Sequence, residues 1–202
     1  MINNIIFDFG NVFMNLDKNA SLEALKQLGL SEWDEHFEQI NQEFEKGKIS
    51  EVLFMIELKK RIPNASVEDI RTAWNAAIKD FPLSRLEFLQ KLSHKYKLYL
   101  LSNIDEIHIA KFEHHVGMTF ARAFYQCFEK VYFSSEIGFR KPEIEAFQFI
   151  LKKHELAPKR TLFVDDEKQN TEIASSLGMH VWHLQIEKED ITALLSKKEI
   201  PF

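Results

Sequence analysis

The chain has 202 residues, of which 45% are hydrophobic and 28% charged, and its formal net charge is -5. This length allows one domain of ordinary size with a modest insertion, and the composition is typical of a globular protein. The chain contains no block of lysine and arginine, which a nucleic-acid surface needs to neutralise phosphates. We therefore expect a small-molecule partner and no nucleic acid.

The N-terminus and the cysteine content indicate a cytoplasmic protein. The sequence MINNIIFDFG carries no basic segment of a secretory signal, and no apolar run approaches the length of about 18 residues that a membrane span needs. The single cysteine, Cys127, has no partner for an intrachain disulfide. It lies in an apolar stretch that is predicted to be helical, and we expect it in the core.

Five short apolar runs are predicted strands, and helical patterns separate them. The runs are mostly apolar on both alternating faces, which is typical of a parallel sheet buried between helices. They are residues Asn4–Phe9, Lys97–Ser102, Lys130–Ser134, Arg160–Val164 and His180–Leu184. The predicted fold class is α/β, with a Rossmann-like parallel sheet core flanked by helices.

The segment between the first and second predicted strands contains only helical patterns. It predicts an inserted, all-helical unit at residues 15–85, so that residues 1–14 and 86–202 form the α/β core. A predicted helix at Leu83–Tyr96 leads back into the sheet.

Serines mark the starts of helices inside this insertion. Ser31 with Asp34, and Ser66 with Asp69, have the spacing of a capping box, in which each side chain bonds the other's main-chain N–H. Ser50 is expected to start a further helix. The apolar side of that helix is predicted to comprise Leu53, Ile56 and Leu58.

Polar residues follow the predicted strands at the edge where a parallel sheet binds its ligands. Asp8 interrupts the apolar run IIFDFG, so it is either a turn-capping residue or a carboxylate held by a cation. A carboxylate can attack phosphorus as a nucleophile, and Mg²⁺ can neutralise the charge of the approaching phosphate. Asp165 and Asp166 follow a later strand and are either a solvated helix cap or further metal ligands.

Three other residues can contact a phosphate group. Lys141 precedes a predicted helix at Glu143–His154, with Pro142 in its first turn, and is either a fixed ammonium or a solvated surface charge. Ser102 and Asn103 offer a hydroxyl and an amide to phosphate oxygens, or alternatively cap the next helix.

Four motifs in order resemble the signature motifs of the haloacid dehalogenase-like hydrolase superfamily: DFGNV, LLSN, RKPE and FVDDEKQN. The resemblance spans nearly the whole chain. It implies that Asp8 is the nucleophile and that Asp8, the Gly10 carbonyl and Asp166 bind Mg²⁺, with Asp165 acting through a metal-bound water.

The resemblance also implies the remainder of the site. Lys141 is expected to be catalytic, and Asn170 to support the loop of the fourth motif. The helical insertion resembles the small cap that closes over the site in this superfamily. Glu45, Lys48 and Trp74 are the cap residues that can face a substrate, although a core position is the favoured interpretation for Trp74. The implied phosphate-binding residues are Ser102, Asn103, Lys141, Gly10 and Asn11.

One position departs from the superfamily pattern. Typical phosphatases of the superfamily have a second aspartate two residues after the nucleophile, as general acid and base, whereas this chain has Gly10. Asp17 is a candidate replacement, although helix capping is the favoured interpretation. The D-x-G-N-V form resembles a branch that includes α-glucose-1-phosphate phosphatases, which indicates a sugar phosphate as substrate.

The predicted function is hydrolysis of a small phosphorylated metabolite by a Mg²⁺-dependent phosphatase, through an aspartyl-phosphate at Asp8. One alternative is a 2-haloacid dehalogenase, against which the Asp165-Asp166 pair argues and which chloride release would identify. Another is a binding protein that holds a phosphorylated ligand with slow turnover, and tight binding without phosphate release would identify it.

Overall fold

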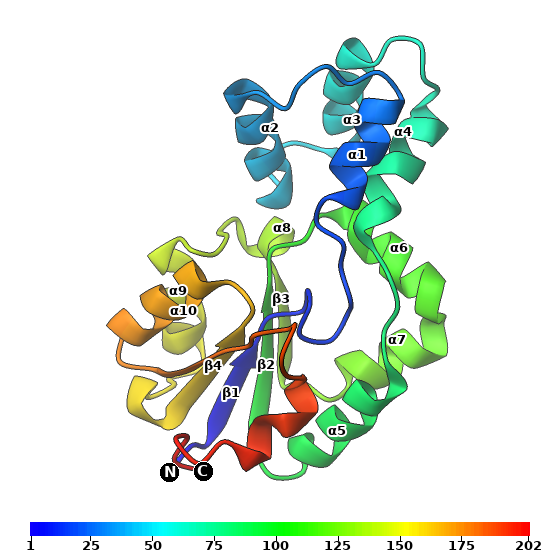
Figure 1. Cartoon of the computed structure of the whole chain (residues 1–202). Helices are drawn as coiled ribbons and strands as arrows, with labels where there is room; N and C mark the ends of the chain where they lie inside the picture. The colour runs from blue at the N-terminus through cyan, green and yellow to red at the C-terminus, as the bar shows by residue number, and fades with distance from the viewer.

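The computed structural model describes residues 1–202 and contains a parallel sheet with a group of helices above one end of it (Figure 1). The strand order is β3-β2-β1-β4-β5, and every neighbouring pair is parallel. The strands are β1 (Asn4–Phe7), β2 (Lys97–Ser102), β3 (Lys130–Phe133), β4 (Thr161–Asp165) and β5 (His180–His183). The predicted fold class is confirmed.

The central strand β1 shows why the sheet needs helices on both faces. Ile5 and Phe7 belong to a large apolar cluster on one face, whereas Ile6 belongs to a smaller cluster on the other. Successive side chains of a strand point to opposite faces, so a strand that is apolar at every position needs helices packed on both faces of the sheet.

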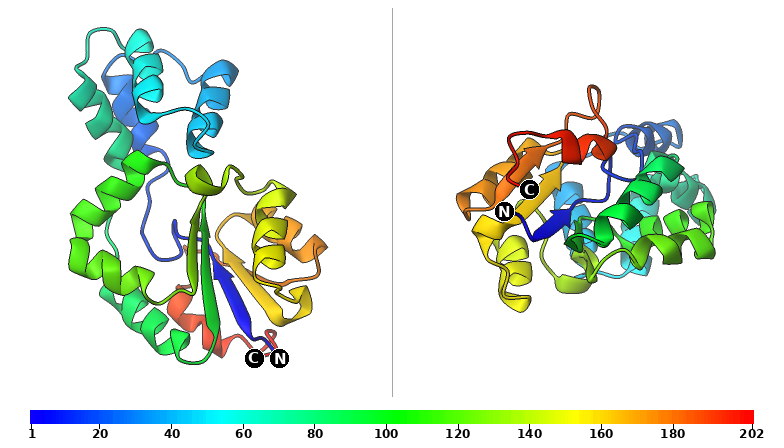
Figure 2. Two further views of the ribbon diagram at one scale, coloured as in Figure 1. Left: turned by 180° about the vertical axis from the view of Figure 1, so that it is seen from behind. Right: turned by 90° about the horizontal axis from the view of Figure 1, so that it is seen from below.

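Helices cover both faces of the sheet, and the two termini lie close together at the end of the sheet away from the upper helices (Figures 1 and 2). The larger cluster includes residues of α5, α6, α7 and the 3₁₀ helix η3, and the smaller cluster includes residues of α9 and α10. These helices are α5 (Leu83–Ser93), α6 (Glu106–Val116), α7 (Met118–Tyr125), α9 (Ile144–Lys153), α10 (Lys168–Ser176) and η3 (Ile191–Ser196). Short elements α8 (Ser134–Ile137) and η2 (Pro158–Arg160) connect them.

The inserted segment forms the upper helices, and the four α-helices among them share an apolar cluster that also includes Ile107 of α6 (Figure 1). The upper helices are α1 (Ala20–Gln27), α2 (Glu35–Glu45), α3 (Glu51–Arg61), α4 (Val67–Trp74) and η1 (Asn75–Ala77). The chain enters and leaves through two hydrogen-bonded segments, in which Asn15 N donates to Asp80 O at 2.9 Å and Asp17 N to Ala77 O at 2.9 Å. We call the upper helices the cap and propose residues 15–85 as its extent.

Two of the three predicted helix starts in the cap are confirmed. Ser66 and Asp69 form the capping box of α4, and Ser50 accepts a hydrogen bond at the start of α3. The start predicted at Ser31 is wrong, because Asp34 caps α2 by accepting from Phe37 N at 2.7 Å. An aspartate at the N-cap needs no serine before it.

The predicted apolar side of α3 is partly wrong. Leu58 is buried, but Leu53 and Ile56 are 51% and 45% exposed. The buried side is set by Phe54, which stacks on Phe44 of α2 with ring centroids 4.3 Å apart. The larger aromatic side chain therefore determines which face of this mostly apolar helix turns inward.

Several helices begin or end a few residues away from the predicted boundaries. The helix predicted at Leu83–Tyr96 ends at Ser93, and Pro142 precedes α9 instead of lying in its first turn, since Glu143 is the N-cap. Cys127 is buried as expected, but it follows the end of α7. No helix of the chain has both the length and the apolar character that crossing a membrane requires.

Candidate functional site

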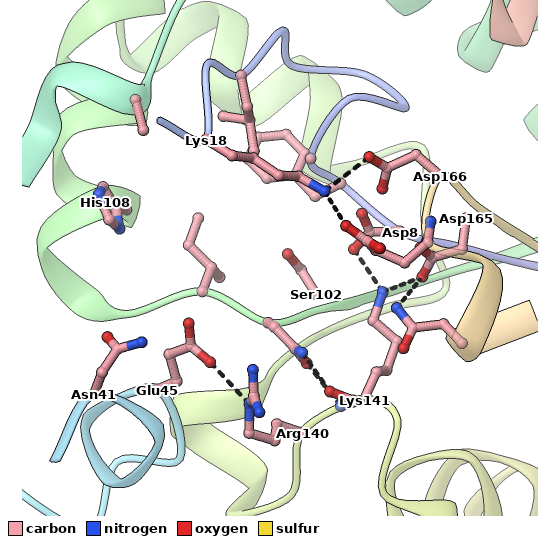
Figure 3. A pocket seen from close by; sticks show the side chains of 18 of the residues that line it. Asp8, Lys18, Asn41, Glu45, Ser102, His108, Arg140, Lys141, Asp165 and Asp166 are labelled. Atoms are coloured by element: carbon pink, nitrogen blue, oxygen red, sulfur yellow. Dashed lines mark hydrogen bonds and ion pairs between the residues drawn. The ribbon is translucent and has the colours of Figure 1, made fainter. Parts of the chain in front are cut away.

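A cavity of about 590 Å³ lies between the cap and the carboxyl ends of the strands. Core residues from β2, β4 and the segment after β1 line one part, and cap residues from α2 and α4 line another (Figure 3). Only eight of its 25 lining residues are hydrophobic. Because ligands of open parallel sheets bind at this edge, the cavity is the candidate active site.

Asp8 occupies the centre of the strand edge, directly after β1. Its main-chain N–H donates to Val164 O at 2.9 Å, which continues the ladder between β1 and β4 and fixes the backbone. The residue is only 8% exposed. The local apolar sequence therefore forces a carboxylate into a buried position, where it needs cationic partners.

Lys141 supplies one of these partners from the loop before α9. Its Nζ lies 2.6 Å from Asp8 Oδ1 and 2.6 Å from Asp165 Oδ2, and its side chain is almost wholly buried. Burial alone would lower the pKa of Lys141, but the carboxylates of Asp165 and Asp8 outweigh it and raise the pKa. The surface-charge alternative for Lys141 is therefore excluded, and the residue is a fixed buried ammonium.

The carboxylates of Asp8, Asp165 and Asp166 form an acidic cluster in which one oxygen of each lies within 4.8 Å of the others. Burial raises the pKa of Asp8 to about 7, with Asp165 and Asp166 adding to the rise and Lys141 opposing it. Lys141 and Lys18 bring two ammonium groups to these three carboxylates, so the cluster remains short of positive charge, and a divalent cation would supply the difference.

The two acids of the fourth motif have different surroundings. Both oxygens of Asp165 are engaged, since Oδ2 accepts from Lys141 and from Asn170 Nδ2 at 3.0 Å and Oδ1 accepts from Glu167 N at 2.8 Å. Asp166 Oδ2 accepts from Asn11 Nδ2 at 2.9 Å and Lys18 Nζ at 3.0 Å. Asp166 is thus held at the cavity wall, whereas Asp165 is tied into the core.

Ser102 ends β2 and Asn103 follows it, and the two side chains differ in which hydrogen-bonding groups are free. Ser102 is buried, lines the cavity and makes no side-chain hydrogen bond, so its hydroxyl is available to a ligand. Asn103 Nδ2 donates to Lys141 O at 2.7 Å and its Oδ1 accepts from Lys141 N at 2.8 Å. The Asn103 amide therefore positions the loop of Lys141. The predicted contact between Asn103 and phosphate would need atoms outside this side-chain amide.

Comparison with known proteins agrees with this geometry. Residues 5–184 match the sequence model of the haloacid dehalogenase-like hydrolase family. The chain belongs to this family. A D-ribitol-5-phosphate phosphatase from Bacteroides thetaiotaomicron is 30% identical over 188 residues, which cover 90% of this chain and 91% of that protein. A sesquiterpene phosphatase from Aspergillus oryzae is 26% identical, with 89% and 88% covered.

A solved structure of this family has the same fold throughout. It is a family enzyme from Bacteroides thetaiotaomicron in complex with magnesium and inorganic phosphate, with a TM-score of 0.85 and 32% sequence identity. The match covers 96% of this chain and 99% of that one. The family and enzyme class predicted from the four motifs are therefore confirmed.

The cap of this hydrolase contributes some of the predicted residues to the cavity. Glu45 and Trp74 line it, whereas Lys48 does not. Asp17 is exposed and lies outside the cavity lining, and its carboxylate accepts from Asn19 N and Ala20 N at the start of α1. Helix capping is therefore its observed role.

Sequence reasoning missed a hydrogen-bonded group that joins core to cap in this hydrolase. Nδ1 of His108 lies 2.7 Å from Asp105 Oδ2, and Nε2 lies 3.0 Å from the Trp74 carbonyl oxygen. Trp74 Nε1 donates to Asp105 Oδ2 at 3.2 Å. Burial would lower the pKa of His108, but Asp105 outweighs it and raises the pKa. The spacing of Asp105 and His108 by three residues, on one side of a helix, was the available signal.

Proposed function

We propose that this hydrolase is a Mg²⁺-dependent phosphatase that cleaves a small phosphorylated metabolite through an aspartyl-phosphate at Asp8. The observation that carries the proposal is the buried Asp8 carboxylate, bonded to Lys141 within an acidic cluster at the floor of the cavity. A carboxylate fixed at the end of a strand can approach phosphorus without reorganising its surroundings.

The acidic cluster has the donor set that suits Mg²⁺, which prefers one or two carboxylates together with waters and phosphate oxygens. Asp8, Asp166 and the Gly10 carbonyl would hold the ion directly. Asp165 would act through water, because Lys141, Asn170 and Glu167 already engage both of its oxygens. When bound, Mg²⁺ neutralises charge on the phosphate and on the cluster.

The reaction would proceed in two steps on Asp8. A carboxylate oxygen of Asp8 attacks phosphorus, a new P–O bond forms and the bond to the leaving oxygen breaks. Lys141 and the free hydroxyl of Ser102 would bind the transferring phosphoryl oxygens, with the expected contacts of Gly10, Asn11 and Asn103 completing the pocket. The leaving oxygen takes a proton from solvent and becomes an alcohol. Water then attacks phosphorus, the bond to Asp8 breaks and a proton returns to solvent, so that the products are an alcohol, inorganic phosphate and the regenerated carboxylate.

We propose a sugar phosphate or sugar-alcohol phosphate as the substrate. Two observations support this class: the cavity is lined mainly by polar residues, and a relative of nearly equal length is a D-ribitol-5-phosphate phosphatase. Gly10 provides no acid to protonate the leaving oxygen, so a leaving group that is stable as an anion, such as an anomeric oxygen, would react faster.

Hydrolysis of an aryl phosphate with and without Mg²⁺ tests the proposal. Asp8→Asn should abolish phosphate release, as should excess chelator, and readdition of Mg²⁺ should restore activity after chelation. Asp17→Asn is the matched control, because Asp17 is exposed and outside the cavity lining. Undiminished release by Asp8→Asn, or in chelator, would exclude this function.

A further inference from the structure

The cap places one amide in the cavity without a partner in the protein. The side-chain oxygen of Asn41, on α2, is buried and accepts no hydrogen bond, and Asn41 lines the cavity. Buried polar atoms in folded proteins nearly always have a partner. The oxygen itself is closed to solvent, so the Asn41 amide must turn toward the cavity to meet a donor, and because Asn41 lines the cavity that donor would belong to a ligand.

Asn75 resembles Asn41 in its unpaired side-chain oxygen but lies outside the cavity lining. The side-chain oxygen of Asn75, also in the cap, is likewise buried without a partner, but Asn75 does not line the cavity. Both residues have an unpaired amide oxygen, but only Asn41 can contact a molecule bound in the cavity. Asn75 is therefore a matched control for Asn41.

Glu45 lies one helical turn after Asn41 and extends into the same cavity (Figure 3). Residues four apart share one face of a helix. Arg140 Nε donates to Glu45 Oε2 at 2.9 Å, which fixes the carboxylate, while no protein group donates to Oε1. The side chain is 20% exposed, so Oε1 is a second acceptor at the same wall.

Three of the eight hydrophobic residues that line the cavity are aromatic, and two of these are tryptophans of the cap. The rings of Trp33 and Trp74 both line the cavity and are parallel, with an interplanar angle of 2° and centroids 6.0 Å apart. These rings offer apolar surface to the carbon chain of a sugar or polyol, whose hydroxyls remain available to acceptors beside them.

From this arrangement we propose that Asn41 and Glu45 form the hydroxyl-recognition wall of the site and select a phosphate ester whose alcohol part is a polyol. The inference rests on the phosphatase function proposed above and names the residues that choose its substrate. Each acceptor takes a hydrogen bond from a substrate hydroxyl while the phosphate lies at Asp8. An isoprenoid phosphate, which has no hydroxyl groups, would leave both acceptors buried and unpaired.

The test compares two phosphate esters with the same number of carbon atoms, D-ribitol 5-phosphate and n-pentyl phosphate, as substrates with Mg²⁺. Loss of a buried hydrogen bond to a substrate hydroxyl typically costs tenfold or more in specificity. We expect Asn41→Leu to lower the ratio of kcat/KM for the polyol ester to kcat/KM for the pentyl ester by about tenfold or more. Asn75→Leu should leave this ratio unchanged.

The possible outcomes separate this inference from the proposed function. If Asn41→Leu has the wild-type ratio, the hydroxyl-recognition wall is refuted and the phosphatase function stands. If the wild-type protein releases phosphate from neither ester nor from an aryl phosphate, the proposed function fails and this inference fails with it. Asn41→Ala, which adds no volume, replaces Asn41→Leu if circular dichroism shows that the leucine variant is unfolded.

Discussion

Leu16 occupies the space that a side chain at Gly10 would need. A Cβ added at residue 10 would lie 2.6 Å from Leu16 Cδ1 and 3.8 Å from Asp8 Oδ2. The position at which related phosphatases are expected to have an acid is therefore closed by an apolar methyl group beside Asp8. The missing aspartate and the position of Leu16 are two aspects of the same local packing.

We expect Gly10→Asp to reduce the free energy of unfolding by about 1 kcal/mol, at the low end for an overpacked position, because Leu16 is only half-buried and its methyl can rotate. In a Leu16→Ala background the same substitution should reduce the free energy of unfolding by less. Urea unfolding of the four proteins in this cycle measures the coupling between the two positions. Equal reductions of the free energy of unfolding in both backgrounds would show that Leu16 does not obstruct position 10.

The same double variant should change the dependence on the leaving group. An acid at position 10 can protonate a departing alkoxide, and general acid catalysis typically contributes about 10²–10⁴ in rate. We expect Gly10→Asp/Leu16→Ala to increase kcat for n-pentyl phosphate relative to kcat for an aryl phosphate, whose leaving group needs no proton. Leu16→Ala alone is the control, and an unchanged ratio in the double variant would count against this role for position 10.

Lys141 should be essential for stability when no metal is present. Lys141→Met leaves Asp8 and Asp165 buried without their cation, and breaking a buried ion pair in this way typically costs about 3–5 kcal/mol. Urea unfolding should show this loss, and Mg²⁺ should recover part of it by occupying the acidic cluster.

Lys18→Met is the comparison for Lys141→Met. Lys18 pairs with Asp166 and Glu167, but half of its side chain is exposed, and such pairs contribute about 0–1 kcal/mol. Equal stability losses in the two variants would contradict the assignment of Lys141 as a buried ammonium.

Much of the core and the floor of the cavity followed from the sequence, because strands that are apolar at every position must form a parallel sheet covered on both faces. The polar residues that end β1, β2 and β4 then meet at one edge. Asp8, Ser102 and Asp165 were predicted for this reason, and the structure brings all three into the cavity lining.

The residues that the cap brings to the site could not be predicted in the same way. Asn41 and Lys18 belong to none of the four motifs, and their positions depend on how the cap packs above the sheet. The inward face of α3 was misassigned because several of its faces are apolar, and the stacking of Phe54 on Phe44 decides between them. Contacts between distant segments, and not local periodicity, determine these features.

Asn103 should act through Lys141. Asn103→Ala removes both hydrogen bonds to the main chain of Lys141, and two such bonds together contribute about 1–3 kcal/mol. We expect lower stability in urea, together with a reduced kcat, because the loop that carries the ammonium loses its support. Asn19→Ala is the control, since Asn19 makes no capping hydrogen bond. A wild-type kcat in Asn103→Ala would show that the loop is held by other contacts.

His108 should make stability depend on pH. Both ring nitrogens face acceptors, the Asp105 carboxylate and the Trp74 carbonyl, and Glu45 adds a further negative charge that raises the pKa of His108. A raised pKa in the folded state means that the contribution to stability is fully present below the unfolded value of about 6.5 and is lost as pH rises through the folded value.

The melting temperatures of wild-type protein and His108→Gln, measured from pH 5.5 to pH 9.5, test this dependence. The wild-type protein should have its largest advantage at the acidic end, and the advantage should shrink as the pH rises, because deprotonation removes the attraction between His108 and Asp105. His114→Gln is the matched control, since His114 is exposed on the same helix. An advantage that grew with pH would mean that His108 is neutral in the folded protein, and the ion pair between His108 and Asp105 would then be excluded.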